Sequence, residues 1–203
     1  MRPPATAAAL AAMTVLLLAA GVVDARTIGG TPRADVLRGT GNDDTIRGGR
    51  GDDQLFGRRG ADRLYGGRGR DRLSGSAGGD RLFGGPGGDA LIGGLDGDRL
   101  FGAGGADTLN GGLGPDAIDG GAGGDRLTGG PNEDTVNGGE GNDKLVGGDD
   151  EDVLSGGAGD DTIDARDDQE DQIDCGDGED TVTVDSAEDG VFDCENIVFP
   201  AGS

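Results

Sequence analysis

Aspartate recurs at every ninth position along most of this chain, and a carboxylate repeated at such regular spacing is suited to binding hard cations. Calcium takes about six to eight oxygen ligands from carboxylates and backbone carbonyls. The chain has no histidine, which excludes His-based catalysis and His ligation and argues against zinc. The candidate metal ligands are Asp44, Asp53, Asp62, Asp71, Asp80, Asp89, Asp98, Asp107, Asp116, Asp125, Asp134, Asp143, Asp152 and Asp161.

These aspartates belong to a nine-residue unit that also contains glycine and one large apolar residue. Leu, Ile or Val lies two residues after each aspartate, from Leu37 to Ile163. Glycine lies five residues before each aspartate, from Gly30 to Gly156. The unit reads G-G-x-G-x-D-x-U-x, where U is the apolar residue. Glycine permits positive φ and close approach of the backbone to an ion. A short strand with one inward side chain and two outward neighbours would explain why each unit has a single apolar residue.

The repeat resembles the repeats-in-toxin (RTX), haemolysin-type calcium-binding family. The resemblance covers Gly30 to Ile163. It implies an all-β, right-handed parallel β-roll, or β-solenoid, with two repeats and therefore 18 residues in each coil. In such a roll each G-G-x-G-x-D forms a turn and each x-U-x a three-residue strand. Odd and even repeats would lie on opposite faces and bury two facing ladders of apolar side chains. The resemblance also implies that the chain binds several Ca²⁺ ions.

Charge gives calcium a physical role in this fold. The net charge is −23, and rows of stacked aspartates repel one another unless cations lie between them. Two turns on the same side of the roll could clamp one ion. Magnesium is the weaker candidate because it demands strict octahedral geometry. The alternative is that the aspartates cap turns by accepting backbone N–H bonds.

Some repeats lack a glycine. The second position is Arg58, Ser76 or Ala103 in three repeats, and the fourth position is Asn42, Asp96, Asn132 or Asp150 in four others. Asn and Asp tolerate the left-handed region, and Asp96 and Asp150 could add ligands.

The chain divides into four segments: 1–25, 26–38, 39–164 and 165–203. Residues 1–25 resemble a cleavable signal peptide, since Arg2 precedes an uncharged apolar stretch that ends in Val23-Asp24-Ala25. The alternative is an uncleaved membrane anchor. We expect an N-terminal capping turn at 26–38, the calcium-binding β-roll at 39–164 and a secreted, extracellular protein.

The last segment, 165–203, is predicted to be a degenerate repeat and cap. Ala165 replaces the expected glycine and one extra residue precedes Ile173. Cys175 and Cys194 are the only cysteines, and a disulfide between them would add about 3 kcal/mol of stability in the chain-entropy model. The alternative is two free thiols.

Outward-facing residues suggest a possible contact surface. Residues 26–99 carry a net charge of +2, and residues 100–203 carry −25. At 18-residue spacing the sequence places three arginines beside three aromatic residues, which should stack one per coil: Arg63, Arg81 and Arg99 beside Tyr65, Phe83 and Phe101. This strip could bind a cell-envelope glycan or another anionic polymer. The alternative is a structural ladder that stiffens the roll.

The leading interpretation is a secreted, non-enzymatic calcium-binding β-roll with a structural, envelope or matrix role. An enzyme is not expected, because no G-x-S-x-G motif occurs and the flanking segments are too short for a catalytic domain. The minor alternatives are ice binding, an accessory module of an enzyme, and a secreted toxin. Nucleic acid is not an expected partner of so acidic a chain, and no membrane span is expected after signal cleavage.

Overall fold

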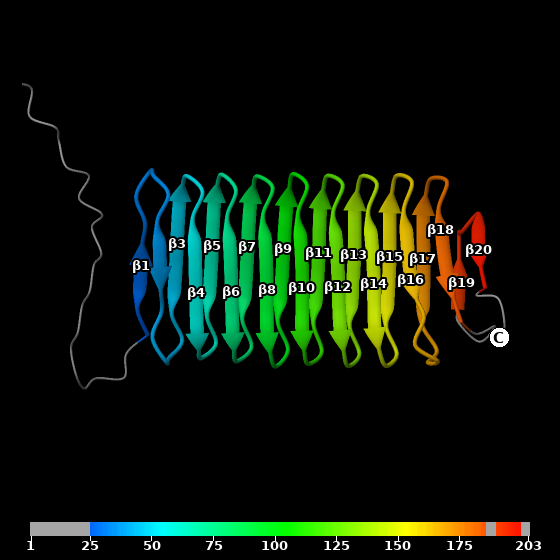
Figure 1. Ribbon diagram of the computed structural model, residues 1–203, viewed down its shortest axis with the longest axis horizontal. Helices are drawn as coiled ribbons and strands as arrows, with labels where there is room; N and C mark the ends of the chain where they lie inside the picture. Colours follow the sequence, from blue (N-terminus) through cyan, green and yellow to red (C-terminus); the bar gives the residue numbers. More distant parts are fainter. Residues whose placement is uncertain (1–24, 186–189, 200–203) are drawn as a thin grey trace, which may run out of the picture.

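Two ten-stranded sheets make up the protein (Figure 1). The structure is a computed structural model that describes residues 25–185 and 190–199. The predicted signal peptide lies outside these residues, apart from Ala25. One sheet contains β1 (Thr27–Gly29), β3 (Thr45–Arg50), β5 (Arg63–Arg68), β7 (Arg81–Pro86), β9 (Arg99–Gly104), β11 (Ala117–Ala122), β13 (Thr135–Glu140), β15 (Val153–Ala158), β17 (Gln172–Asp177) and β19 (Gly190–Phe192). The other contains β2 (Val36–Arg38), β4 (Gln54–Arg59), β6 (Arg72–Ala77), β8 (Ala90–Leu95), β10 (Thr108–Leu113), β12 (Arg126–Pro131), β14 (Lys144–Asp149), β16 (Thr162–Ala165), β18 (Thr181–Val184) and β20 (Asn196–Val198).

The strands within each sheet are parallel, and the chain alternates between the two sheets (Figure 1). Most paired residues are 18 apart in sequence, as in the pairing of Leu55 with Leu73. Two repeats therefore make one coil, and the predicted parallel β-solenoid of 18 residues per coil is confirmed. No helix in the described part of the chain is long and apolar enough to span a membrane.

The apolar residue of each repeat lies between the sheets. From Ile46 to Ile163 these side chains are at most 3% exposed, and they form a single core cluster. The two facing apolar ladders predicted from the repeat are therefore present. The core is only one large side chain deep in each strand, because the neighbouring side chains along the strand point outward.

The strands are longer than the repeat pattern predicts. A complete repeat forms a strand of six residues, as in β5, which runs past x-U-x into both glycines and the residue after them. The prediction of three-residue strands and six-residue turns is therefore wrong. Glycine does not end the pairing here, since Gly49 pairs in register with Gly67 of the next coil. The connection between strands is correspondingly short.

Both predicted end segments contain strands of the same two sheets. After Ala165 the pairing offset increases to 19, so that Leu154 pairs with Ile173, which confirms the predicted extra residue. The Cys175–Cys194 disulfide forms, with the two Cα atoms 5.1 Å apart.

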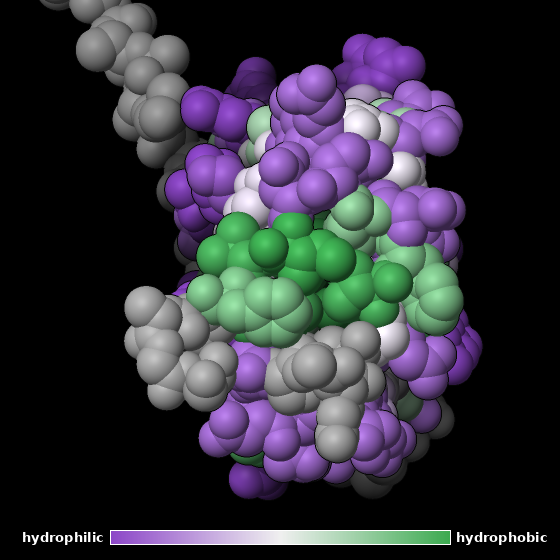
Figure 2. All heavy atoms as spheres, turned by 90° about the vertical axis from the view of Figure 1, so that its right-hand side faces the viewer, coloured by the Kyte–Doolittle hydropathy of each residue, from purple (hydrophilic) through white to green (hydrophobic). Residues whose placement is uncertain are grey.

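Figure 2 looks onto the C-terminal end, where apolar residues gather at the centre of a hydrophilic rim. The exposed apolar residues of this segment include Phe192, Ile197, Val198 and Phe199.

Candidate metal centre

Each repeat aspartate points into the roll beside the apolar core. Around β4, the inward positions are Asp53, Leu55 and Gly57, which alternate along the chain. A Cβ added at Gly57 would overlap the carboxyl group of Asp62, which immediately precedes the following strand, β5. The interior of a coil therefore contains two apolar side chains, one from each strand. At each of the two edges of this interior, a carboxyl group faces a glycine. All fourteen predicted ligands are at most 4% exposed.

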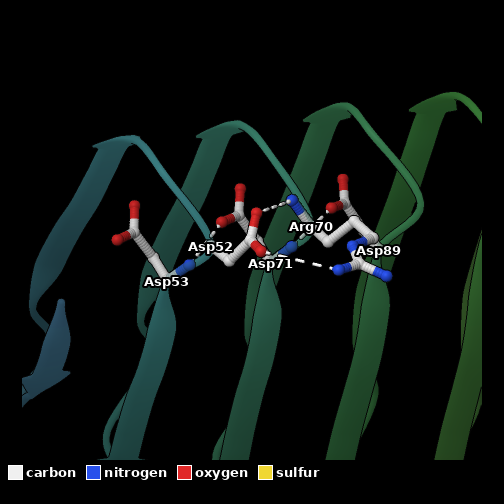
Figure 3. A network of polar contacts seen from close by, with 5 residues as sticks. All are labelled: Asp52, Asp53, Arg70, Asp71 and Asp89. Carbon is white, nitrogen blue, oxygen red and sulfur yellow. Dashed lines mark hydrogen bonds and ion pairs between the residues drawn. The ribbon is translucent and has the colours of Figure 1, made fainter. Parts of the chain in front are cut away.

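One oxygen of each carboxyl group holds neighbouring coils together. The Asp53 backbone N–H donates to Asp71 Oδ1 at 2.8 Å, and the Asp71 N–H donates to Asp89 Oδ1 at 2.7 Å (Figure 3). The same bond recurs at 18-residue spacing along both edges of the roll. Oδ1 therefore accepts a backbone N–H, as in the turn-capping alternative, but the bond joins neighbouring coils and not residues of one turn. In the same turns the exposed Asp52 accepts the Arg70 N–H at 2.9 Å.

The second carboxyl oxygen lacks a hydrogen-bond donor in thirteen consecutive repeats. Oδ2 is buried and unpartnered from Asp53 to Asp161. Around Gly84, the position that a Cβ would occupy lies 2.5 Å from Asp89 Oδ2 and 2.9 Å from the carbonyl oxygen of Gly102. Both acceptors therefore lie beside Gly84, and the carboxyl oxygen has no donor. Burying an ionised carboxylate in this way is costly unless a proton or a cation compensates for it.

Burial raises the pKa values of these carboxyl groups. Loss of surrounding water is the largest cause; the accepted N–H bond acts in the opposite direction, and at many positions nearby aspartates add to the increase. The pKa is raised to about 7 at Asp80, Asp89, Asp98, Asp134 and Asp152. It is raised to about 6 at Asp53, Asp62, Asp107, Asp116 and Asp161. The pKa is also raised at Asp71, Asp125 and Asp143.

The available donors fit a cation that prefers oxygen ligands. In residues 25–185 and 190–199, no three His, Cys, Asp or Glu side chains come together closely enough to hold a metal by themselves. Backbone carbonyls must therefore complete any site, and the Gly102 carbonyl beside Asp89 Oδ2 shows that they are at hand. Calcium accepts this mixture of carboxylate and carbonyl oxygens in flexible geometry. The buried, donor-free oxygens thus fit calcium.

The first and last repeats differ from the central ones. Asp44 is among the predicted ligands, but its Oδ2 already accepts bonds from the Thr40 backbone N–H at 2.6 Å and the Thr40 hydroxyl at 2.9 Å. Threonine at the second position of a repeat was the sequence signal for this difference. Asp180 was missed, although its Oδ2 is buried and donor-free as in the central repeats. The D-x-U fragment Asp180–Val182 marks this position in the sequence.

Most residues that replace glycine in the repeats adopt a positive φ, as glycine does there. Arg58, Ser76 and Ala103 have φ values of 91°, 91° and 83°, and Asp96 and Asn132 have 71° and 85°. The left-handed turn geometry therefore survives at these positions, whereas Asn42 does not adopt it. Asp96 Oδ2 accepts the backbone N–H one coil earlier at 3.1 Å, and Asn132 Oδ1 accepts the corresponding bond at 3.0 Å. These side chains supply hydrogen bonds between coils.

Replacing the first glycine of a central repeat should disrupt the stack. In Gly84→Ala the new Cβ would lie 2.5 Å from Asp89 Oδ2 and 2.9 Å from a backbone carbonyl, so neighbouring coils must separate. We expect a loss of roughly 1–3 kcal/mol or more, as in other overpacked interiors. The matched control is Gly104→Ala, whose Cβ would meet nothing within 4 Å. Thermal unfolding in saturating calcium measures both variants, and equal melting temperatures would contradict this account.

On the outer face, the predicted ladders of rings and arginines are present. The ring centroids of Tyr65 and Phe83 are 4.9 Å apart, as are those of Phe83 and Phe101, with interplanar angles of 6° and 5°. The three arginines beside them pair in register, one per coil. Arg47 was not part of the predicted strip, but its guanidinium lies 5.1 Å from the centroid of the Tyr65 ring. Because the rings stack on one another, most of their faces are covered.

The comparisons with known proteins agree with this geometry. The model of the RTX calcium-binding nonapeptide repeat matches the chain in overlapping segments that together extend from residue 29 to residue 182. No curated protein matches the chain.

Proposed function

The chain belongs to the family of RTX calcium-binding nonapeptide repeats, and from this premise we propose that it is a calcium-binding protein whose coils are held together by rows of ions. The observation that carries the proposal is the unbroken series of thirteen buried carboxyl oxygens without a donor. The proposed ligands are these oxygens, from Asp53 to Asp161, together with backbone carbonyls of nearby glycines such as Gly102.

Two oxygens of one carboxyl group would then have separate tasks. Oδ1 fixes the preceding coil through its N–H bond, as from Asp71 to Asp89. Oδ2 supplies negative charge in the interior, where bound calcium would provide the compensating positive charge. Each added coil contributes two such carboxyl groups, one at each edge. The carboxyl groups form rows only when the coils are stacked in the folded chain. Calcium binding and folding therefore become one event.

The proposed setting is extracellular, and the proposed role is structural, at a cell envelope or in a matrix. The Cys175–Cys194 disulfide supports this setting, since disulfides persist in oxidising compartments. A millimolar-range calcium requirement would suit such surroundings. The repeats supply a binding and structural function, and we propose no catalytic one.

Neutralising one row of carboxyl groups tests whether they are ligands. Asparagine keeps the Oδ1 acceptor and places an N–H donor where Oδ2 meets the glycine carbonyl. We expect fewer bound ions and a higher calcium midpoint, but a metal-free protein that is more stable than the wild type. The variant replaces three consecutive residues of one edge by Asn: Asp89, Asp107 and Asp125.

The matched control changes the charge equally on the exposed side of the turns. Its three residues also accept backbone N–H bonds between coils: Asp43, Asp52 and Asp160. We expect this control to keep the wild-type calcium stoichiometry, measured by isothermal titration calorimetry. If the buried variant also keeps it, the aspartates only cap turns and the proposal fails.

A second candidate function is binding to an anionic surface through one face of the roll. The strands β3, β5, β7 and β9 contain six arginines and no Asp or Glu. This is the same region as the predicted strip of Arg63, Arg81 and Arg99. The covered ring faces, however, support the structural interpretation of the aromatic ladder. Charge, rather than stacking on the rings, would have to provide the attraction.

A further inference from the structure

A groove runs along this basic face beside the aromatic ladder. Its volume is about 620 Å³, and its lining includes Tyr65, Phe83, Arg50 and Arg68. Along β5 the order of residues is Tyr65, two glycines and then Arg68. The glycines have no side chains to fill the space between the ring column and the arginine column. The groove is therefore a direct consequence of the repeat.

The charged side chains along the groove, Arg50 and Arg68, are both positive. Because the rings stack face to face, they present their edges sideways, and the edge of an aromatic ring carries the positive part of its quadrupole. Arg50 and Arg68 pair in register on adjacent strands, which brings like charges together. Among the described residues, no Asp or Glu lines the groove. In the described part of the chain the ion pairs are Arg70–Asp52 and Arg166–Asp164, so neither groove arginine is neutralised.

We propose that this groove binds a linear polysaccharide of acidic sugars. Guanidinium groups can hold sugar carboxylates or sulfates through paired hydrogen bonds. Neighbouring coils repeat about every 4.8 Å, which is comparable to the length of one pyranose residue, so a chain lying along the roll would place about one sugar at each coil and would meet Arg50 and Arg68 on adjacent coils. The inference deepens the second candidate function above and rests on the proposed calcium-loaded fold, without which there is no groove.

The geometry argues against single-stranded nucleic acid as the occupant. Proteins that bind single strands usually stack bases on exposed aromatic faces. Here Phe83 lies between Tyr65 and Phe101, and Arg47 lies over the outer face of Tyr65. A sugar chain needs only the edges and the arginines.

The test uses the calcium-loaded full chain and the hexamer of galacturonic acid, with binding measured by isothermal titration calorimetry at about 0.1 M salt. At this ionic strength the Debye length is about 10 Å, so charges farther from the ligand contribute little. We expect the methyl-esterified hexamer, which has the same rings without the charge, to bind at least tenfold more weakly. The double variant Arg50→Ser/Arg68→Ser should also lose at least tenfold in affinity. The matched control Arg72→Ser/Arg126→Ser removes two exposed arginines from the opposite sheet and should bind as the wild type.

Several outcomes would overturn the inference. Unchanged binding by the Arg50/Arg68 variant would exclude the groove. A loss confined to Arg63→Ser/Arg81→Ser/Arg99→Ser would move the site to the other side of the rings and leave the second candidate function standing. Tighter binding of the oligonucleotide dT12 would indicate nucleic acid, and equal binding of the esterified hexamer would show that charge is not used. Failure of the calcium proposal would appear separately, as circular dichroism that does not respond to calcium.

Discussion

Chelation of calcium at pH 8 is expected to abolish most of the β-structure of this chain, and calcium is expected to restore it. Without cations, thirteen consecutive buried carboxyl groups each keep an oxygen that has no donor, in a chain of net charge −23. The aliphatic core, one large side chain deep in each strand, cannot offset that repulsion. Far-UV circular dichroism and hydrodynamic radius, followed during a calcium titration, should show one cooperative transition at roughly 10⁻⁴–10⁻³ M, the range of extracellular modules.

Magnesium provides the matched control for charge screening. It carries the same charge as calcium but demands strict octahedral geometry and gives up its waters reluctantly, so we expect it to restore little structure at equal concentration. Recovery in magnesium as complete as in calcium would show that screening alone stabilises the roll. A chelated protein as compact and as heat-resistant as the calcium-loaded one would contradict the proposed function itself.

The nine-residue period predicted one buried apolar residue in each repeat, and the resemblance to the RTX family implied the β-roll and its 18-residue coil. These features depend on one inward apolar residue recurring in phase, as from Leu55 to Leu73. The strand lengths were mispredicted because glycine usually favours turns. Here the first glycine of a repeat continues the strand and leaves room for a carboxyl group five residues later, as Gly84 does for Asp89.

Features that depend on contacts between coils were harder to predict. Threonine at the second position satisfies the carboxyl group of Asp44, although the D-x-U motif there is identical to that of a central repeat. The groove beside Tyr65 combines residues from successive coils of one sheet. The sequence placed the rings in a column, but the close stacking that covers their faces came only from the structure. That stacking changed the expected mode of contact from ring faces to ring edges and charge.

Acidification is expected to stabilise the metal-free chain. In an unfolded chain aspartate titrates near pH 3.9, whereas burial raises the pKa of residues such as Asp89 and Asp98 to about 7 in the roll. Between these values the folded form binds more protons than the unfolded form, so stability rises as the pH falls. The stabilisation of the folded chain by these protons is complete below about pH 4 and is lost as the pH rises through about 7. Circular dichroism in chelator should therefore show more β-structure at pH 5 than at pH 8.

Protons and calcium should compete for the same oxygens, which separates this effect from a general loss of charge repulsion. The calcium midpoint should rise as the pH falls from 8 to 6, because a protonated carboxyl group is a poor ligand. In the variant with Asn at Asp89, Asp107 and Asp125, both responses should shrink, whereas neutralising the exposed Asp43, Asp52 and Asp160 should leave them intact. If the exposed variant shrinks the acid response equally, repulsion between surface charges governs it and the buried carboxyl groups do not.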